Sequence, residues 1–403
     1  MLNFPDALQE STTMPDTRLL QTLIAQGENS AVEFKSHPAR TEVIAREMVA
    51  FANGSGGTLL LGVEDDGAIS GISGDDVEEW VMNIARTLVN PALSVSYASV
   101  QLDGKTVAII TIPKGEDKPY QTRDKYLVRV GSTNRLATQA ELMRLFQLSG
   151  AFHFDQTPVT RTTLNDLNTA ALDSYFAAYD IQFSQEPDTA RRQLLINTDI
   201  LTESGELTVG GLLMFGINPS RYLQQAAIMF AHFDGLEPAA ELIDRQEIIG
   251  TLPYQVDTTV AVLKNNLRRP STIIGTKRVD TVALPPDKVL RELVVNACVH
   301  RNYAIRGTRI RLFLYRDRIE CLSPGRLPNT VTVDKLRSGV SYATNPVLLK
   351  FMDNLRYIDR LGRGFPMIFR EMKQLGVEIE VTELGEELRV VIPLPDSTMP
   401  PTG

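Results

Sequence analysis

The chain has 403 residues, enough for two or three domains and for a hydrophobic core that needs neither disulfides nor a structural metal. Hydrophobic residues make up 43% and charged residues 22%, which excludes a disordered chain, and the net charge of −8 excludes a protein that is basic over its whole surface. Two cysteines, no apolar run near about 18–20 residues and no basic-then-apolar start predict a cytoplasmic protein that does not contact membranes.

The first 149 residues alternate between helical and strand patterns. A lead-in covers residues 1–15, and Asp103-Gly104 is a strong hairpin signal. The pattern predicts helices at 16–25, 42–53, 75–88 and 139–148, and strands at 31–35, 58–63, 94–102, 106–112 and 125–130. Residues 16–149 are therefore predicted to form a complete α/β domain.

The remainder is predicted as a linker, a connecting segment and a second domain. The linker covers 150–163 and contains Pro158, the mostly helical connecting segment covers 164–245, and the second domain covers 246–394. We expect helices at 167–179, 190–197, within 246–269, from Pro286, at 345–352 and at 364–375, strands at 226–233, 308–315 and 318–322, and a final hairpin at 379–392. Residues 395–403 are a proline-rich tail. The predicted class is α/β (α+β).

The helix that starts at Pro286 carries three polar residues spaced four apart. Glu292, Asn296 and His300 lie one above another at the rim of an apolar face. Carboxylate and amide oxygens are ligands for Mg²⁺, so Glu292 and Asn296 can position a metal and a water against a phosphate. The alternative is a core helix whose polar side chains bond the nearby backbone.

Three acidic residues are expected at neighbouring strand ends. Glu28 and Glu33 flank the start of the first strand, and Asp65 follows the next one. Converging carboxylates repel one another unless a divalent cation lies among them, and such a cation can polarise a phosphodiester and activate water. Otherwise these acids cap and solvate a surface edge.

Basic residues are concentrated in two places. Arg129 and Arg135, with the turn between them, suit contacts to a phosphate backbone, although a charged edge strand would show the same pattern. A second group follows the helix that starts at Pro286, and it suits nucleic acid, a dimer interface or a solvated face: Arg301, Arg306, Arg309, Arg311, Arg316 and Arg318.

Three motifs of the first domain occur in a characteristic order: ENSAVEFK, MVAFANGSGGTLLLGVEDDGAISGI and YLVRVGSTNR. Together they resemble the Schlafen-type AlbA-2 domain, which implies a mixed α/β fold and nucleic-acid binding. The resemblance also extends to the carboxylate set of Schlafen endoribonucleases. By position it implies Glu28, Glu33 and Asp65 as catalytic and metal-binding residues, with Lys35 neutralising phosphate beside them.

NACVHRNY, at 296–303, resembles the N-box of the ATP-binding fold of gyrase, histidine kinases and mismatch-repair proteins, the GHKL class. More narrowly, it resembles a family described as related to an ATP-dependent DNA helicase. This implies a Bergerat-type α/β sandwich that binds ATP and Mg²⁺. The implied cofactor residues are Glu292, Asn296 (also a metal ligand), His300, Arg301, Gly325 of the Ser-Pro-Gly loop, and Gly362, Arg363 and Gly364 of DRLGRGFPMI.

Two departures limit what this resemblance implies. The Asp-x-Gly-x-Gly motif that reads adenine is replaced by Ser323-Pro324-Gly325, which leaves ATP recognition and hydrolysis open. The sequence has no G-x-x-x-x-G-K-S/T loop, so we do not expect a helicase motor.

Three hypotheses follow. The first is a regulatory protein that binds DNA or RNA, such as a DNA-binding transcription regulator, with ATP tuning a homo-oligomer. The second is a Mg²⁺- or Mn²⁺-dependent endoribonuclease that cleaves structured RNA such as tRNA. The third is a degenerate ATP fold that serves as an assembly scaffold.

Overall fold

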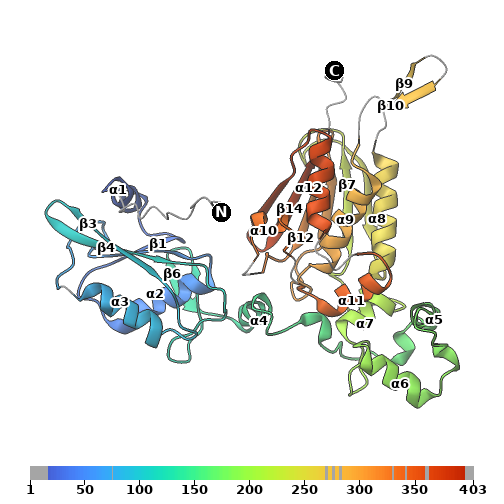
Figure 1. Cartoon of the computed structure of the whole chain (residues 1–403), viewed down its shortest axis with the longest axis horizontal. Helices are drawn as coiled ribbons and strands as arrows, with labels where there is room; N and C mark the ends of the chain where they lie inside the picture. The colour runs from blue at the N-terminus through green and yellow to red at the C-terminus, as the bar shows by residue number, and fades with distance from the viewer. Residues whose placement is uncertain are drawn as a thin grey trace, which may run out of the picture. The chain divides into compact units, whose positions relative to one another are not determined.

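The computed structural model describes residues 17–74, 76–267, 271–274, 277–280, 284–328, 331–340, 343–358 and 363–394. The chain forms two compact units, Met1–Ala151 and Phe152–Gly403 (Figure 1). The sequence-predicted lead-in, the proline-rich tail and Gly362 lie outside the described residues. In the described part of the chain, no helix is long and apolar enough to cross a membrane.

The first unit is built on a four-stranded sheet in the order β1-β2-β4-β3, in which only β1 and β2 are parallel. At the β3–β4 turn, Asp103 and Gly104 have φ values of 52° and 74°, as a tight hairpin requires. The elements are α1 (Thr17–Gln26), β1 (Val32–Lys35), α2 (Thr41–Asn53), β2 (Gly57–Leu61), α3 (Val77–Thr87), β3 (Ser96–Leu102), β4 (Lys105–Ile112), β5 (Leu127–Val130), β6 (Thr133–Leu136) and α4 (Gln139–Leu148).

Strand β2 is buried on both faces, which explains its unbroken apolar run. Leu59 and Leu61 belong to the core that includes α2 and α3, whereas Leu60 points to the other face, into a core with Leu20 of α1. Because successive side chains of a strand alternate between faces, a strand covered on both sides needs apolar residues at every position. Helices on both faces therefore bury β2, which pairs with the edge strand β1.

The second unit is built on a six-stranded sheet in the order β13-β14-β12-β11-β7-β8. The pairing of β7 with β11 is parallel and the others are antiparallel. The strands are β7 (Ile228–Phe233), β8 (Leu242–Ile248), β11 (Ile310–Leu314), β12 (Arg318–Pro324), β13 (Glu380–Leu384) and β14 (Glu387–Pro393). Helices α8 (Leu252–Asn266), α9 (Asp287–Val299) and α12 (Gly364–Gln374) stand side by side along this sheet (Figure 1). This arrangement is an α/β sandwich.

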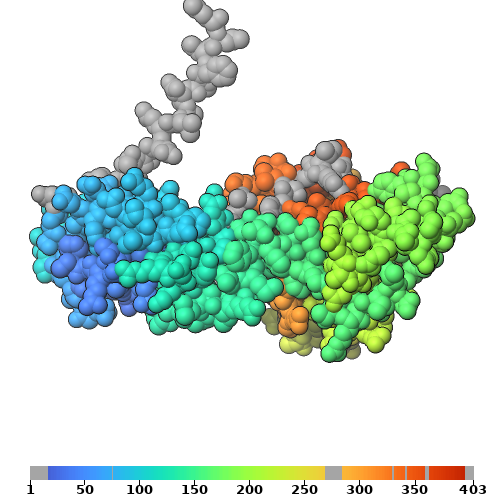
Figure 2. Space-filling view, turned by 90° about the horizontal axis from the view of Figure 1, so that it is seen from below, coloured from blue at the N-terminus to red at the C-terminus, as the bar shows by residue number. Residues whose placement is uncertain are grey.

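The segment before β7 is helical and belongs to the second unit. It contains α5 (Thr169–Ala177), α6 (Asp188–Asn197) and α7 (Val209–Phe215), and its surface is drawn green to lime in Figure 2. The same unit includes α10 (Val333–Arg337), α11 (Pro346–Asn354) and the hairpin of β9 (Ser271–Ile274) and β10 (Lys277–Asp280). These helices share one hydrophobic core with the sheet: Leu172 of α5, Leu195 of α6 and Leu212 of α7 belong to the same cluster as Leu312 of β11.

The structure adds a strand to the predicted elements at residues 242–248. The long helix expected within 246–269 is confirmed as α8, which starts at Leu252, and the segment before it contains β8. Strand β8, with sequence LIDRQEI, lies at the edge of the sheet and most of its side chains are exposed or half-buried. A strand with little buried surface has no alternating apolar pattern, so the sequence did not predict it.

Asp155 caps the start of α11, although α11 begins nearly 200 residues later in the chain. The side chain is fully buried, and its Oδ2 accepts hydrogen bonds from the N–H groups of Val347 at 2.7 Å and Leu348 at 3.1 Å. These amides belong to the first turn, where a helix has no partners of its own for its N–H groups. Burial raises the pKa of Asp155 to about 6.

We expect Asp155 to make the free energy of unfolding fall as the pH rises from about 4 to about 6. The unfolded chain loses this proton near its ordinary pKa of 3.8, whereas the folded protein keeps it up to about 6, so ionisation favours the unfolded state. The loss amounts to at most about 3 kcal/mol. Urea unfolding followed by far-UV circular dichroism should show a weaker pH dependence for Asp155→Asn. The control is Asp188→Asn, at an exposed carboxylate, and equal pH dependence in all three proteins would contradict the assignment.

Candidate functional site

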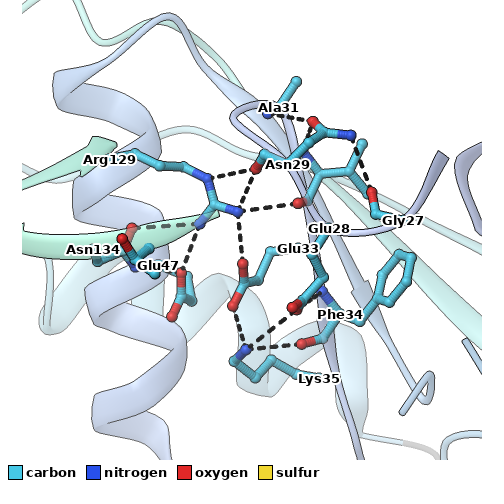
Figure 3. Close-up of polar contacts among 12 residues, drawn as sticks. Gly27, Glu28, Asn29, Ala31, Glu33, Phe34, Lys35, Glu47, Arg129 and Asn134 are labelled. Atoms are coloured by element: carbon cyan, nitrogen blue, oxygen red, sulfur yellow. Dashed lines mark hydrogen bonds and ion pairs between the residues drawn. The ribbon is translucent and has the colours of Figure 1, made fainter. Parts of the chain in front are cut away.

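Arg129 of β5 lies buried at the centre of a polar network in the first unit (Figure 3). Its side chain is 3% exposed, and Nη2 forms an ion pair with Glu33 Oε2 at 2.6 Å. The guanidinium also donates to the carbonyl oxygens of Asn29, at 2.9 and 2.6 Å, and of Val32, at 3.0 Å. It lies over the ring of Phe51, 4.5 Å from the centroid. The structure therefore places Arg129 where it ties β5 to the start of β1, turned away from solvent.

Lys35 lies between the two acids at the start of the first strand. Its ammonium pairs with Glu33 Oε1 and lies 3.9 Å from Glu28 Oε1. Glu28 Oε1 also accepts the Phe34 N–H at 3.0 Å. Both oxygens of Glu33 thus contact cations of the protein itself, Lys35 on one side and Arg129 on the other.

Asp65 is exposed in the turn that follows β2, and among the described residues no hydrogen bond or ion pair joins it to this network. In the described part of the chain, no three His, Cys, Asp or Glu side chains are arranged to hold a metal ion. A divalent cation between Glu28 and Glu33 would need the position that the Lys35 ammonium takes. The three acids of the sequence hypothesis therefore do not fit a divalent cation in this arrangement, and we derive no cleavage step through one.

Glu47 of α2 is a second acid that contacts Arg129, in addition to Glu33. Its Oε2 accepts from Asn134 Nδ2 and lies 3.4 Å from Arg129 Nη1. Burial raises the pKa of Glu47, and the charge of Glu33 raises it further. Sequence analysis missed Glu47 because it falls among the apolar residues of a core helix, and only its position on the face toward β5 and β6 reveals its role.

Arg135 faces a carboxylate of its own domain. Arg135 forms a bidentate salt bridge with Glu141, at 2.8 and 2.6 Å, which lowers the pKa of the Glu141 carboxyl to about 2. Glu141 also caps α4 together with Thr138. This pair is partly exposed, so Arg135 is a more accessible cation than Arg129.

The second unit contains a cavity between α9, the ends of β12 and β14, and the start of α12. Its lining is mostly apolar, with Leu293, Leu327 and Val390 among the contributors. A few polar groups converge on it: Glu292, Asn296, His300, Ser323, Arg326 and Thr344. An apolar cavity with a few convergent polar groups is typical of a small-molecule site.

Glu292 and Asn296 meet at this cavity as the helical spacing predicts. Asn296 Nδ2 donates to both Glu292 O and Glu292 Oε1 at 2.8 Å. Gly364, the first residue of α12, lies directly over the carboxylate: a Cβ there would come within 1.9 Å of Glu292 Oε1. Only glycine lets the two helices approach this closely. No donor among the described residues forms a hydrogen bond with Asn296 Oδ1. This oxygen is therefore the amide atom available to a ligand.

His300 and Arg301 follow Asn296 but have different environments. His300 lines the cavity, and burial lowers its pKa to about 4, so it is neutral at physiological pH. Arg301 is fully buried and donates to the carbonyl oxygens of Asn302, Ile305 and Thr308 at 2.8–2.9 Å. The structure therefore places Arg301 as a support for the loop from 302 to 308 rather than in the cavity lining.

The glycine positions expected around the phosphates are only partly described. Gly325 lines the cavity with φ of 126°, a conformation that favours glycine, and its N–H donates to Glu386 O at 2.7 Å. Arg363 precedes α12 and does not appear in the lining, and Gly362 lies outside the described residues. Of the glycines implied by the resemblance, Gly325 and Gly364 both line the cavity.

Comparison with known proteins assigns both units. Residues 28–138 match the family model described as "Schlafen, AlbA_2". The chain carries a Schlafen AlbA_2 domain. Residues 307–392 match the model "Putative ATP-dependent DNA helicase recG C-terminal", so the chain also has a RecG-related C-terminal domain. Together the matches indicate a nucleic-acid-related function.

Two solved structures are similar to parts or most of this chain. The DIP2311 protein from Corynebacterium diphtheriae is 23% identical, with 93% of this chain and 79% of that chain covered and a TM-score of 0.46. The N-terminal domain of a RecG-related protein from Nitrosomonas europaea is 27% identical, with 30% and 92% covered and a TM-score of 0.25. No curated protein matches the sequence significantly.

The Arg129 network lies within the matched AlbA_2 segment, whereas the helix with Glu292 and Asn296 lies before the residues matched to the RecG-related model. The spacing of four between these two residues was therefore the signal that found the second site, independently of the matched strands that complete it.

Proposed function

We propose that this protein is a nucleic-acid-binding regulatory protein whose C-terminal domain binds ATP. The observation that carries the proposal is the Glu292–Asn296 pair at the cavity, held under the first residue of α12. A carboxylate and an amide at one end of an apolar cavity suit a nucleotide, whose base takes the apolar part and whose phosphates take the polar end.

The residues present fit a Mg²⁺–nucleotide complex. Asn296 Oδ1 is an oxygen ligand of the kind Mg²⁺ takes, and Mg²⁺ usually combines one or two protein oxygens with phosphate oxygens and waters. A bound Mg²⁺ would neutralise phosphate charge beside Glu292. The N–H groups of the first turn of α12 provide donors for an anion, and Gly364 has no side chain to cover them.

The site departs from the usual adenine recognition. Ser323-Pro324-Gly325 stands in place of the Asp-x-Gly-x-Gly motif, whose aspartate reads adenine. The Ser323 hydroxyl donates to Ala297 O at 2.9 Å, so toward the cavity its oxygen can act only as an acceptor. We therefore propose that base selection is weak and that purine nucleotides bind mainly through apolar contacts and the phosphate end.

Regulation requires that ATP and nucleic acid affect each other's affinity. If ATP raises the affinity for nucleic acid by some factor, nucleic acid must raise the affinity for ATP by the same factor. We further propose that the protein acts as a homo-oligomer, which size-exclusion chromatography with light scattering will test with and without ATP.

The direct test uses the full chain with Mg²⁺–ATP in a calorimetric titration, and labelled single- and double-stranded DNA and tRNA in fluorescence anisotropy. We expect saturable binding of ATP and of nucleic acid, with equal mutual enhancement or weakening. Binding of neither would overturn the proposal, whereas nucleic-acid binding without ATP binding would leave the C-terminal domain as a scaffold.

Endoribonuclease activity is the alternative that this arrangement does not favour, although Glu28 and Glu33 both lie near the Lys35 ammonium. With Mn²⁺ and labelled tRNA, we expect no cleavage that distinguishes the natural protein from Glu33→Gln, because both Glu33 oxygens already pair with Lys35 and Arg129. Cleavage by the natural protein alone would contradict this expectation and assign Glu33 to the reaction.

A further inference from the structure

A second concave site of the C-terminal unit lies where the parallel strands β7 and β11 begin. It is a hollow of about 320 Å³. Gln224, Gln225 and Met229 line one side, and the segment 306–309 with Arg311 lines the other. The register pairs Arg311 with Met229, so the two sides are held by neighbouring strands of the sheet. Nothing in the proposed function uses this site.

Positive charge is in excess in this hollow. Arg309 pairs with Glu247 at 3.0 Å and Arg311 pairs with Glu387, whose other oxygen accepts from Thr308 Oγ1 at 3.3 Å. The hollow has a third guanidinium group, that of Arg306. Three guanidinium groups therefore have two carboxylate partners between them.

Arg306 is the cation left over. It is exposed at the rim of the hollow, and its side chain has no ion pair or hydrogen bond with the residues that the structure describes. Arg311 Nε is buried and also lacks a hydrogen-bond acceptor among them. A hollow with spare guanidinium donors and one net positive charge attracts an anion with several acceptor oxygens.

This hollow and the nucleotide cavity lie on opposite faces of the sheet. Leu312 pairs with Cys321, which lines the nucleotide cavity on the side of α9. Arg311 pairs with Leu322 one position earlier, so its side chain points to the other face. A ligand in the hollow therefore does not compete for the space of a nucleotide beside Asn296.

We propose that this hollow binds a backbone phosphate of the nucleic acid, so that the C-terminal unit contacts nucleic acid directly. Phosphate is the anion that an arginine fork matches in shape. The same sheet face carries Phe313, half-buried and two residues from Arg311, with its ring 5.8 Å from that of Phe233. Guanidinium groups beside an aromatic ring suit a nucleic-acid strand better than a free phosphate, because a base can stack where the next phosphate is held. The inference rests on the proposed nucleic-acid binding.

The test compares Arg306→Ala/Arg309→Ala with a matched double variant, Arg191→Ala/Arg370→Ala, in the full chain. The control removes two arginines of the same unit that lie outside the hollow and pair with acidic residues. The probes are a labelled mixed-sequence single strand and the corresponding duplex, measured by anisotropy over a range of salt concentrations. Inorganic phosphate and Mg²⁺–ATP are titrated separately.

We expect the first variant to bind both probes roughly tenfold more weakly at low salt. The slope of log K against log salt should fall by about one for each lost phosphate contact, while ATP affinity stays unchanged. The control should keep the natural slope. Equal loss in both double variants, or loss of phosphate or ATP binding with nucleic-acid binding intact, would overturn the inference. If the natural protein binds no nucleic acid at all, the proposed function itself fails.

Discussion

Replacing Asn296 with alanine is expected to weaken Mg²⁺–ATP binding roughly 10- to 100-fold, the loss typical of groups that hold or orient a metal. Asn296 does two things at once. Its Oδ1 is the oxygen we assign to Mg²⁺, and its Nδ2 holds the Glu292 carboxylate in place at 2.8 Å. Calorimetric titration of the full chain will measure the change.

The matched control for this variant is Asn197→Ala, at an exposed asparagine at the end of α6. It should bind ATP as the natural protein does. A second variant, Gly364→Ala, places a methyl group within 1.9 Å of Glu292 Oε1 and should weaken ATP binding without removing any polar group. Natural ATP affinity in Asn296→Ala would exclude this cavity as the nucleotide site.

Replacing Arg129 with alanine should destabilise the first unit by roughly 3–5 kcal/mol, because it takes a buried cation away from two buried carboxylates, of which only Glu33 keeps an ion pair, with Lys35. Glu33 and Glu47 are 6% and 8% exposed, and both face the guanidinium. The variant also loses three hydrogen bonds to backbone carbonyls. The effect should be larger than that of any exposed ion pair of the same unit.

Trp80 provides a specific measurement, because it is the single tryptophan of the chain and lies on α3 of the first unit. Urea unfolding followed by tryptophan fluorescence therefore reports on that unit. The control is Arg123→Ala, which breaks an exposed pair with Glu42 and should change the stability by less than about 1 kcal/mol. If Arg129→Ala unfolds like the control but binds nucleic acid poorly, Arg129 contacts nucleic acid after all.

Two basic residues of the first unit, Arg129 and Arg135, differ in burial in a way that the sequence pattern does not predict. Arg129 and Arg135 are close in sequence and were expected to act together on phosphate. The structure gives them different surroundings: Arg129 is buried against Glu33, whereas Arg135 is partly exposed against Glu141. Alternation along a strand predicts which side chains share a face, but not whether another part of the chain covers that face.

The sequence by itself determined the local features of this protein. The spacing of Glu292 and Asn296 is a property of one helix, so they lie together as predicted, and the Asp103-Gly104 turn and the buried run of β2 are equally local. The tertiary structure decided every feature that joins distant segments. Arg129 meets Glu33 across 96 positions, and Asp155 caps α11 across 192. Such contacts depend on how strands and helices pack, and periodicity within a segment carries no information about its partner.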